Sequence, residues 1–138
     1  MIEYLVSVEG ITADQLHGFF VGWPNPPSPE THLRLLQQSD EVVLAMDVSR
    51  GIVVGFVTAN TDRVLTAYIP LLEVLPGYQQ QRIGKTLMQK MLERLSDYYA
   101  IDLLCDPDLQ PFYEQFGMRR ATGMFLRNYD KQSGSGRA

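Results

Sequence analysis

The 138-residue sequence contains one cysteine, Cys105, and two isolated histidines, His17 and His32. A single thiol excludes an internal disulfide framework and suits a reducing compartment, so we expect a cytoplasmic protein. Cysteine-rich zinc sites are excluded as well, and we expect no metal. No apolar run approaches the roughly 18 residues of a membrane span, and the N-terminus lacks the layout of a signal peptide.

A surplus of positive charge is also missing. The net charge is −4, whereas a nucleic-acid surface carries a basic stripe, so we expect no nucleic-acid partner. An anionic cofactor is not excluded, because backbone N–H groups at the start of a helix can hold a phosphate. The acidic balance mildly favours a cationic acceptor such as an amine.

The length matches one domain, and 45% hydrophobic residues are enough to bury a core. We expect a single domain over residues 1–130 and a flexible tail over 131–138, where glycine and serine gather. Periodicity and turn residues predict strands over 2–8, 41–47, 52–59, 64–75, 100–105 and 118–129, and helices starting near 12, 29, 78 and 106. This order predicts an α/β (α+β) fold with a mixed, mostly antiparallel sheet flanked by helices.

The segment 74–86 joins the end of a strand to an amphipathic helix that has no acidic residue before Glu93. A helix start carries partial positive charge and free N–H groups, and Arg82 and Lys85 add formal charge. Gly84 allows close approach to the backbone. The junction therefore suits a phosphate, although an ordinary helix start with a solvated basic first turn explains these residues equally well.

Residues 74–87 resemble motif A of the GCN5-related N-acetyltransferases (GNATs), Arg/Gln-x-x-Gly-x-Gly/Ala. Gln79 matches the first position and Gly84 the last, while Arg82 stands where the first glycine is usual. Residues 104–118 are similar to motif B, with its Phe-Tyr-x-x-x-Gly-Phe ending. Two matching segments in the right order make the resemblance specific.

The resemblance implies a GNAT acyl-CoA N-acyltransferase fold and an enzyme that transfers the acetyl group of acetyl-CoA directly to an amine. The implied acceptor is a small-molecule or protein amine, and CoA is the implied second product. The resemblance places the cofactor along Leu72, Val74, Gln79, Gln80, Gln81, Arg82, Ile83, Gly84, Lys85 and Thr86.

Two side chains are candidates for proton transfer. Tyr113 matches the family tyrosine that acts as general acid near the CoA sulfur; the alternative is an aromatic core residue. Glu73 is the only acid in 67–75, and many GNATs place a base on this strand; the alternatives are a solvent-facing carboxylate or a structural ion pair. The backbone amide near Val74 would polarise the acetyl carbonyl.

Pro70 predicts an interruption of the strand ladder, since proline is disfavoured inside a central strand. GNATs carry a bulge on this strand, which splays from the next one to admit the pantetheine arm; the alternative is an edge strand. Phe20 and Trp23 lie where the family builds part of its acceptor pocket, and Tyr68 is expected to face the same cleft; core packing is the alternative for each. Cys105 is expected to be a buried thiol rather than a nucleophile.

Two other functions remain open from sequence. One is a non-catalytic acyl-CoA-binding or regulatory module on the same fold, since a fold does not guarantee activity. The other is an interaction domain that forms a homodimer through its C-terminal strand.

Overall fold

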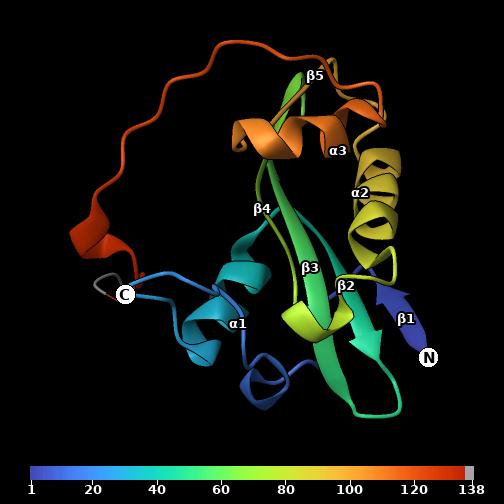
Figure 1. Ribbon diagram of the computed structural model, residues 1–138, viewed down its shortest axis with the longest axis vertical. Helices are drawn as coiled ribbons and strands as arrows, with labels where there is room; N and C mark the ends of the chain where they lie inside the picture. The colour runs from blue at the N-terminus through green and yellow to red at the C-terminus, as the bar shows by residue number, and fades with distance from the viewer. Residues whose placement is uncertain (136–138) are drawn as a thin grey trace.

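The computed structural model describes residues 1–135 and places five strands between helices (Figure 1). The sheet runs in chain order, β1 (Ile2–Leu5), β2 (Glu41–Asp47), β3 (Ile52–Thr61), β4 (Thr66–Val74) and β5 (Ala100–Asp102). The helices are α1 (Pro29–Gln38), α2 (Ile83–Arg94) and the short α3 (Gln110–Glu114). β1 to β4 are antiparallel and β5 is parallel to β4, which confirms the predicted mixed sheet.

Local sequence signals explain the best-predicted elements. α1 begins where the sequence predicts it, because the Ser28 side chain accepts the Thr31 amide at 3.1 Å and Pro29 occupies the first turn. β2 and β3 form the expected hairpin, and Gly51 closes their turn with a φ of 66°.

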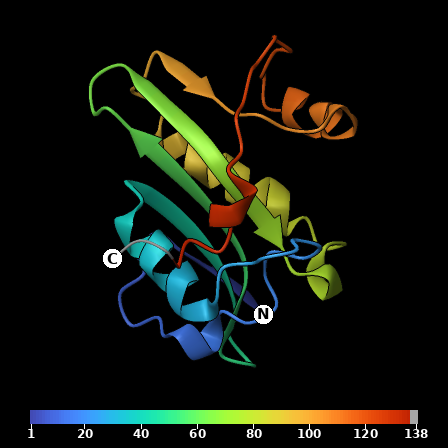
Figure 2. The ribbon, with the colours of Figure 1, turned by 90° about the vertical axis from the view of Figure 1, so that its left-hand side faces the viewer.

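Each face of the sheet is covered by a helix (Figure 2). The cluster on the α2 side includes Val43, Val57, Leu87 and Met91, all fully buried. The cluster on the α1 side is built around Phe56. Within residues 1–135, none of the helices is long and apolar enough to cross a membrane.

β4 contains a bulge beside Pro70, as the sequence predicts. Leu71 pairs with Thr58 but Tyr68 pairs with Asn60, so β4 has one extra residue between these pairs. An extra residue moves every following side chain to the opposite face. Ala67 therefore packs toward α2, whereas Leu71 packs toward α1.

β4 and β5 separate soon after they meet. Their pairing covers only Thr66–Tyr68 against Ala100–Asp102, so the rest of β4 has no neighbour on that side within the described part of the chain. The Leu75 amide bonds to the Val54 carbonyl at 2.8 Å, so the backbone groups of Leu75 point toward β3. Because hydrogen bonding alternates along an antiparallel strand, the backbone groups of Leu72 and Val74 point the other way, into the gap. The expected splay is confirmed.

Some predicted elements are wrong. The strand expected over 118–129 does not form; residues 118–128 are extended without strand pairing. The helix expected near 12 is only the 3-10 turn Ala13–Gln15, and the helix expected from 106 splits into the 3-10 turn Pro107–Leu109 and α3. β1 and β5 are shorter than predicted, and α2 starts at Ile83 rather than near 78.

The expected flexible tail is anchored over the part that is described. The Asn25 amide donates to the Gln132 side chain at 2.9 Å, and Arg34 donates to the Gly134 carbonyl at 3.1 Å. These bonds hold the end of the chain against the α1 region. Residues 136–138 of the predicted tail lie outside the described residues.

Candidate functional site

The first turn of α2 leaves backbone donors without partners. Its first internal bond runs from the Thr86 amide to the Arg82 carbonyl at 3.1 Å. The amides of Ile83, Gly84 and Lys85 have no acceptor within residues 1–135, and no side chain caps the helix. The turn also lacks acidic residues, so free N–H groups and the helix dipole favour an anion here.

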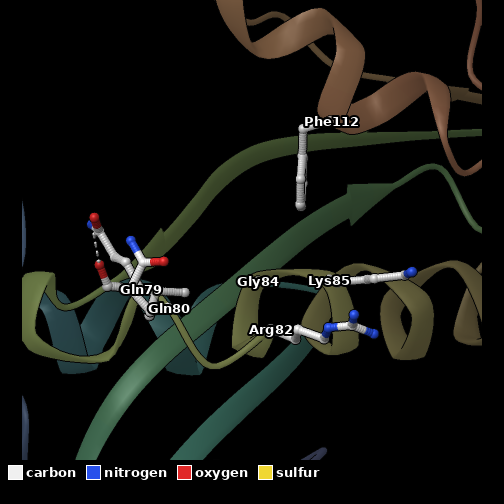
Figure 3. A pocket seen from close by; sticks show the side chains of 7 residues that line it. Gln79, Gln80, Arg82, Gly84, Lys85 and Phe112 are labelled. Carbon is white, nitrogen blue, oxygen red and sulfur yellow. Dashed lines mark hydrogen bonds between the residues drawn. The ribbon is translucent and has the colours of Figure 1, made fainter.

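A cleft of about 360 Å³ lies over this turn, between the end of β4 and α3 (Figure 3). Its lining residues are Val74, Gln79, Gln80, Arg82, Gly84, Lys85 and Phe112. The Arg82 and Lys85 side chains extend in the same direction, which brings two cations to one side of the helix start. A phosphate in the cleft would meet both formal and partial positive charge.

Gly84 keeps the middle of the cleft open. A Cβ at this position would lie 3.7 Å from the Phe112 ring and 3.8 Å from the Val74 side chain. A methyl group would therefore fill the space beside the free amides without clashing. The site fits a pyrophosphate in two respects: its donors carry positive charge, and Gly84 leaves space beside them.

Arg82 adopts the left-handed conformation, with a φ of 59°. Glycine reaches this region without steric cost, whereas a residue with a Cβ does not. The backbone conformation thus accounts for the glycine that motif A usually has here. Arg82 adopts this conformation despite its Cβ, and its guanidinium lines the cleft.

The loop before α2 is tied to the sheet. Gln79 donates its side-chain N–H to the Val74 carbonyl at 3.0 Å, which satisfies one group facing the gap. The Tyr78 hydroxyl donates to the Asp47 carboxylate at 2.6 Å and accepts from Arg50 at 2.9 Å. The Ser49 hydroxyl also donates to Asp47, at 2.8 Å. The bond from Tyr78, followed by that from Ser49, lowers the pKa of Asp47.

Tyr113 lies on α3, next to Phe112 and packed against the α2-side cluster. Burial raises its pKa to about 12, and the nearby Cys105 adds to the shift. The phenol therefore keeps its proton at neutral pH, which is one condition for the predicted general acid, although the higher pKa also makes it a weaker acid. Desolvation, then Asp106 and Asp108, also raises the pKa of Cys105, so this thiol is no ready nucleophile.

Because of the bulge, Glu73 lies on the face of β4 that is turned away from α2. Its carboxylate accepts the amide of Phe20 at 2.8 Å and the amide of Val21 at 3.2 Å. Phe20 has a φ of 62°, so the carboxylate holds a strained turn of the 18–23 loop. Glu73 is thus not simply solvent-facing, and each oxygen retains a second lone pair for a proton or a water.

The structure brings together some of the predicted acceptor-site residues. The Phe20 ring lies 4.9 Å from the Trp23 ring and is buried, while Trp23 is half-exposed. Tyr68 is also partly exposed and precedes the bulge on the same face of β4 as Glu73. Phe20, Trp23 and Glu73 therefore form one group, with Tyr68 farther along the strand.

Residues 8–118 match the sequence model of the acetyltransferase (GNAT) family. The chain belongs to the GNAT family. A crystal structure from Deinococcus radiodurans, assigned as an acetyltransferase, is 49% identical and superposes with a TM-score of 0.92, covering 96% of this chain and 92% of that one. A GNAT acetyltransferase from Streptococcus pneumoniae is 29% identical with a TM-score of 0.72, covering 93% and 98%.

Curated relatives agree with this assignment. The chloroplastic GCN5-related N-acetyltransferase 3 of Arabidopsis thaliana is 37% identical over an alignment of 89 residues that covers 59% of this chain. The chain spans 38% of the length of that relative. An uncharacterized N-acetyltransferase of Porphyra purpurea, ycf52, is 28% identical over 119 residues, covering 83% of this chain and 68% of that one.

Sequence reasoning missed several residues of this GNAT site. The contacts of Asp47 and Arg50 with Tyr78 join segments about thirty residues apart, and no local sequence pattern predicts them. Phe112 lines the cleft, whereas the motif pointed to its neighbour Tyr113 as the candidate acid. The bonds from Glu73 to the 18–23 loop had one indirect signal, the pair Gly18 and Gly22, both of which take positive φ.

Proposed function

We propose that the chain is an N-acetyltransferase that moves the acetyl group of acetyl-CoA to an amine. The observation that carries this proposal is the α2 start, where three free amides, Arg82 and Lys85 meet the gap beside β4. The amides match a pyrophosphate, and the backbone of Leu72 and Val74 offers a strand-like edge to the amide groups of a pantetheine arm. Gln80, Gln81 and Thr86 complete the proposed cofactor site.

The residues of the chain have defined roles in this reaction. The thioester supplies an activated acetyl group, which the amine nitrogen attacks as the C–N bond forms and the C–S bond breaks. The Val74 N–H, which faces the gap, stabilises the charge that develops on the carbonyl oxygen. Glu73 accepts the proton that the amine loses, directly or through water, and Tyr113 gives a proton to the departing sulfur.

The acceptor is proposed to enter on the face that carries Glu73, Phe20, Trp23 and Tyr68. The aromatic rings there suit the apolar part of an amine, and a carboxylate suits its charge. In this arrangement the acceptor and the CoA phosphates approach from opposite sides of β4, and the acetyl group lies in the gap between them. Small-molecule and protein amines both fit this description.

Titration calorimetry with acetyl-CoA tests the cofactor. We expect saturable binding, and absence of heat at high micromolar ligand would remove the cofactor claim. Release of free thiol over a panel of amines then tests the reaction. Binding without thiol release for any amine would indicate the alternative function, a non-catalytic acyl-CoA-binding module.

We also propose a cytoplasmic location, which rests on the single cysteine and the reducing compartment that it suits. Two relatives from Arabidopsis thaliana are named chloroplastic. Fractionation of the native cells with an antibody to the chain distinguishes the two compartments.

A further inference from the structure

The turn that leads into α2 has few hydrogen bonds of its own. The Tyr78 amide bonds to the Leu75 carbonyl at 2.9 Å, and from there to the Thr86 amide no backbone N–H has an acceptor within residues 1–135. The free amides of the cleft belong to this same stretch. A turn without internal hydrogen bonds does not fix its own shape, so contacts with the rest of the chain must hold the amides in place.

Tyr78 makes the shortest of these contacts. Its hydroxyl donates to the Asp47 carboxylate at 2.6 Å and accepts from Arg50 at 2.9 Å, while its ring packs against the α2-side cluster. Asp47 is only 7% exposed, and Ser49 donates to its other oxygen at 2.8 Å. A hydrogen bond to an ionised carboxylate is about twice as strong as one between neutral groups.

Asp47 belongs to a rigid part of the sheet. It ends β2 and pairs with β1 on one side and β3 on the other. Its carbonyl accepts the Gly51 amide at 2.8 Å in the turn between β2 and β3, and the Gln15 side chain donates to the Gly51 carbonyl at 3.0 Å. Tyr78 therefore connects a loosely bonded turn to a point of the sheet that is fixed from several directions.

Among the described residues, neither Tyr78 nor Asp47 lines the cleft. The lining residues on the turn are Gln79, Gln80 and Arg82 (Figure 3). The negative charge of Asp47 would moreover repel a phosphate, so any effect of this carboxylate on the cofactor is indirect. Such an effect is expected, because donors that are already in position bind an anion without the cost of ordering them.

We propose that Asp47 is a positioning residue for the phosphate-binding turn and acts through the Tyr78 hydroxyl. The bond fixes the start of the turn, so that the amides of residues 83–85 are in place before the cofactor arrives. This inference rests on the proposed function, because it assumes that the turn binds the pyrophosphate of acetyl-CoA. The pantetheine part, which is proposed to bind along β4, should not depend on the bond.

Two conservative substitutions weaken or remove this bond. Tyr78→Phe keeps the ring in the cluster and removes the hydroxyl, whereas Asp47→Asn keeps the shape of the acceptor and removes its charge. We expect each to raise the dissociation constant of acetyl-CoA on the order of tenfold in titration calorimetry. Because the two residues act as one unit, the double variant should bind about as well as Tyr78→Phe alone.

Tyr98→Phe is the matched control. Tyr98 also packs against the α2-side cluster, and its hydroxyl donates to Thr61 at 3.2 Å, beyond the opposite end of α2 from the cleft. This variant loses a hydroxyl of the same kind and should bind acetyl-CoA as the wild type does. Urea unfolding of all the variants measures how much stability each change removes.

Acetyl-pantetheine, which lacks the pyrophosphate and the adenosine, separates positioning of the turn from a general loss of structure. Its dissociation constant, from a chemical-shift titration, should be equal in wild type, Tyr78→Phe and Asp47→Asn. An equal loss for acetyl-CoA and acetyl-pantetheine, or an unchanged acetyl-CoA affinity in Tyr78→Phe, would overturn the proposal. Absence of acetyl-CoA binding by the wild type would remove the proposed function itself, and this inference with it.

Discussion

The carboxylate of Glu73 accepts the backbone amide of Phe20 at 2.8 Å, across 53 residues of sequence. This bond joins the strand before the candidate cofactor site to the loop that carries the candidate acceptor pocket. One carboxylate can therefore shape the pocket and take part in proton transfer. The two roles make different predictions.

Replacement of Glu73 separates these roles. Glu73→Gln keeps an oxygen that can accept an amide, so we expect a stable fold with a low rate at neutral pH and a flattened pH–rate profile. Glu73→Ala leaves both loop amides without their acceptor and should also lower the unfolding free energy by about 1–3 kcal/mol. Thiol release against pH and urea unfolding measure the two effects. Glu93→Gln on the exposed side of α2 is the control, and an unchanged rate in Glu73→Gln would exclude a base role.

Arg82→Gly should raise stability and weaken the cofactor at the same time. Glycine removes the cost of the left-handed conformation at φ 59°, so we expect a gain of about 1 kcal/mol in unfolding free energy. Loss of the guanidinium should raise the dissociation constant of acetyl-CoA about tenfold.

Arg82→Ala is the matched control for this change. It loses the charge but retains the conformational cost, so the affinity should fall without the gain in stability. Calorimetry and urea unfolding of both variants provide the comparison. Equal acetyl-CoA affinity in wild type and Arg82→Gly would mean that the side chain does not reach the phosphate.

Tyr113→Phe should lower kcat by about a hundredfold and leave the melting temperature close to that of the wild type, because the ring stays in place while the proton donor is lost. Since the pKa of Tyr113 is raised to about 12, its deprotonation should not limit the rate below pH 10. Tyr99→Phe, at a side chain that is 86% exposed, is the control. If Tyr113→Phe turns over at the wild-type rate, the sulfur receives its proton from another group.

His32 should make the fold sensitive to acid. Its ring is 1% exposed among Phe19, Phe20 and Phe56, and neither nitrogen has a partner within residues 1–135. Burial lowers its pKa from 6.5 to about 4, so the folded chain keeps the ring neutral while the unfolded chain binds a proton. The stability from this neutral ring is present above pH 6.5 and is lost as pH falls toward 4.

The expected loss over this interval is about 3 kcal/mol, measured by urea unfolding across the range. His32→Leu should flatten the pH dependence, because the titrating group is gone. His17→Gln, at an exposed histidine, should leave the dependence as in wild type. A slope that persists unchanged in His32→Leu would assign the acid sensitivity to other groups.

Local signals in the sequence were enough for several elements of the fold. The Ser28–Pro29 cap, the turn before Ile52 and the apolar stripe of α2 depend on residues within one or two turns of one another. Pro70 predicted an interruption of β4, because proline has no N–H to donate to the hydrogen-bond ladder between strands. Motif A likewise located the helix start whose free amides form the candidate site.

Local patterns in the chain therefore predicted the order of most elements and the position of the turn that begins α2. Three features became visible only in the folded chain: the bulge turns Glu73 toward Phe20, Tyr78 bonds to Asp47, and residues 118–128 pair with no strand among residues 1–135. The reason is physical. Capping and periodicity are written in adjacent residues, whereas strand pairing and long-range hydrogen bonds depend on which distant partner is within reach.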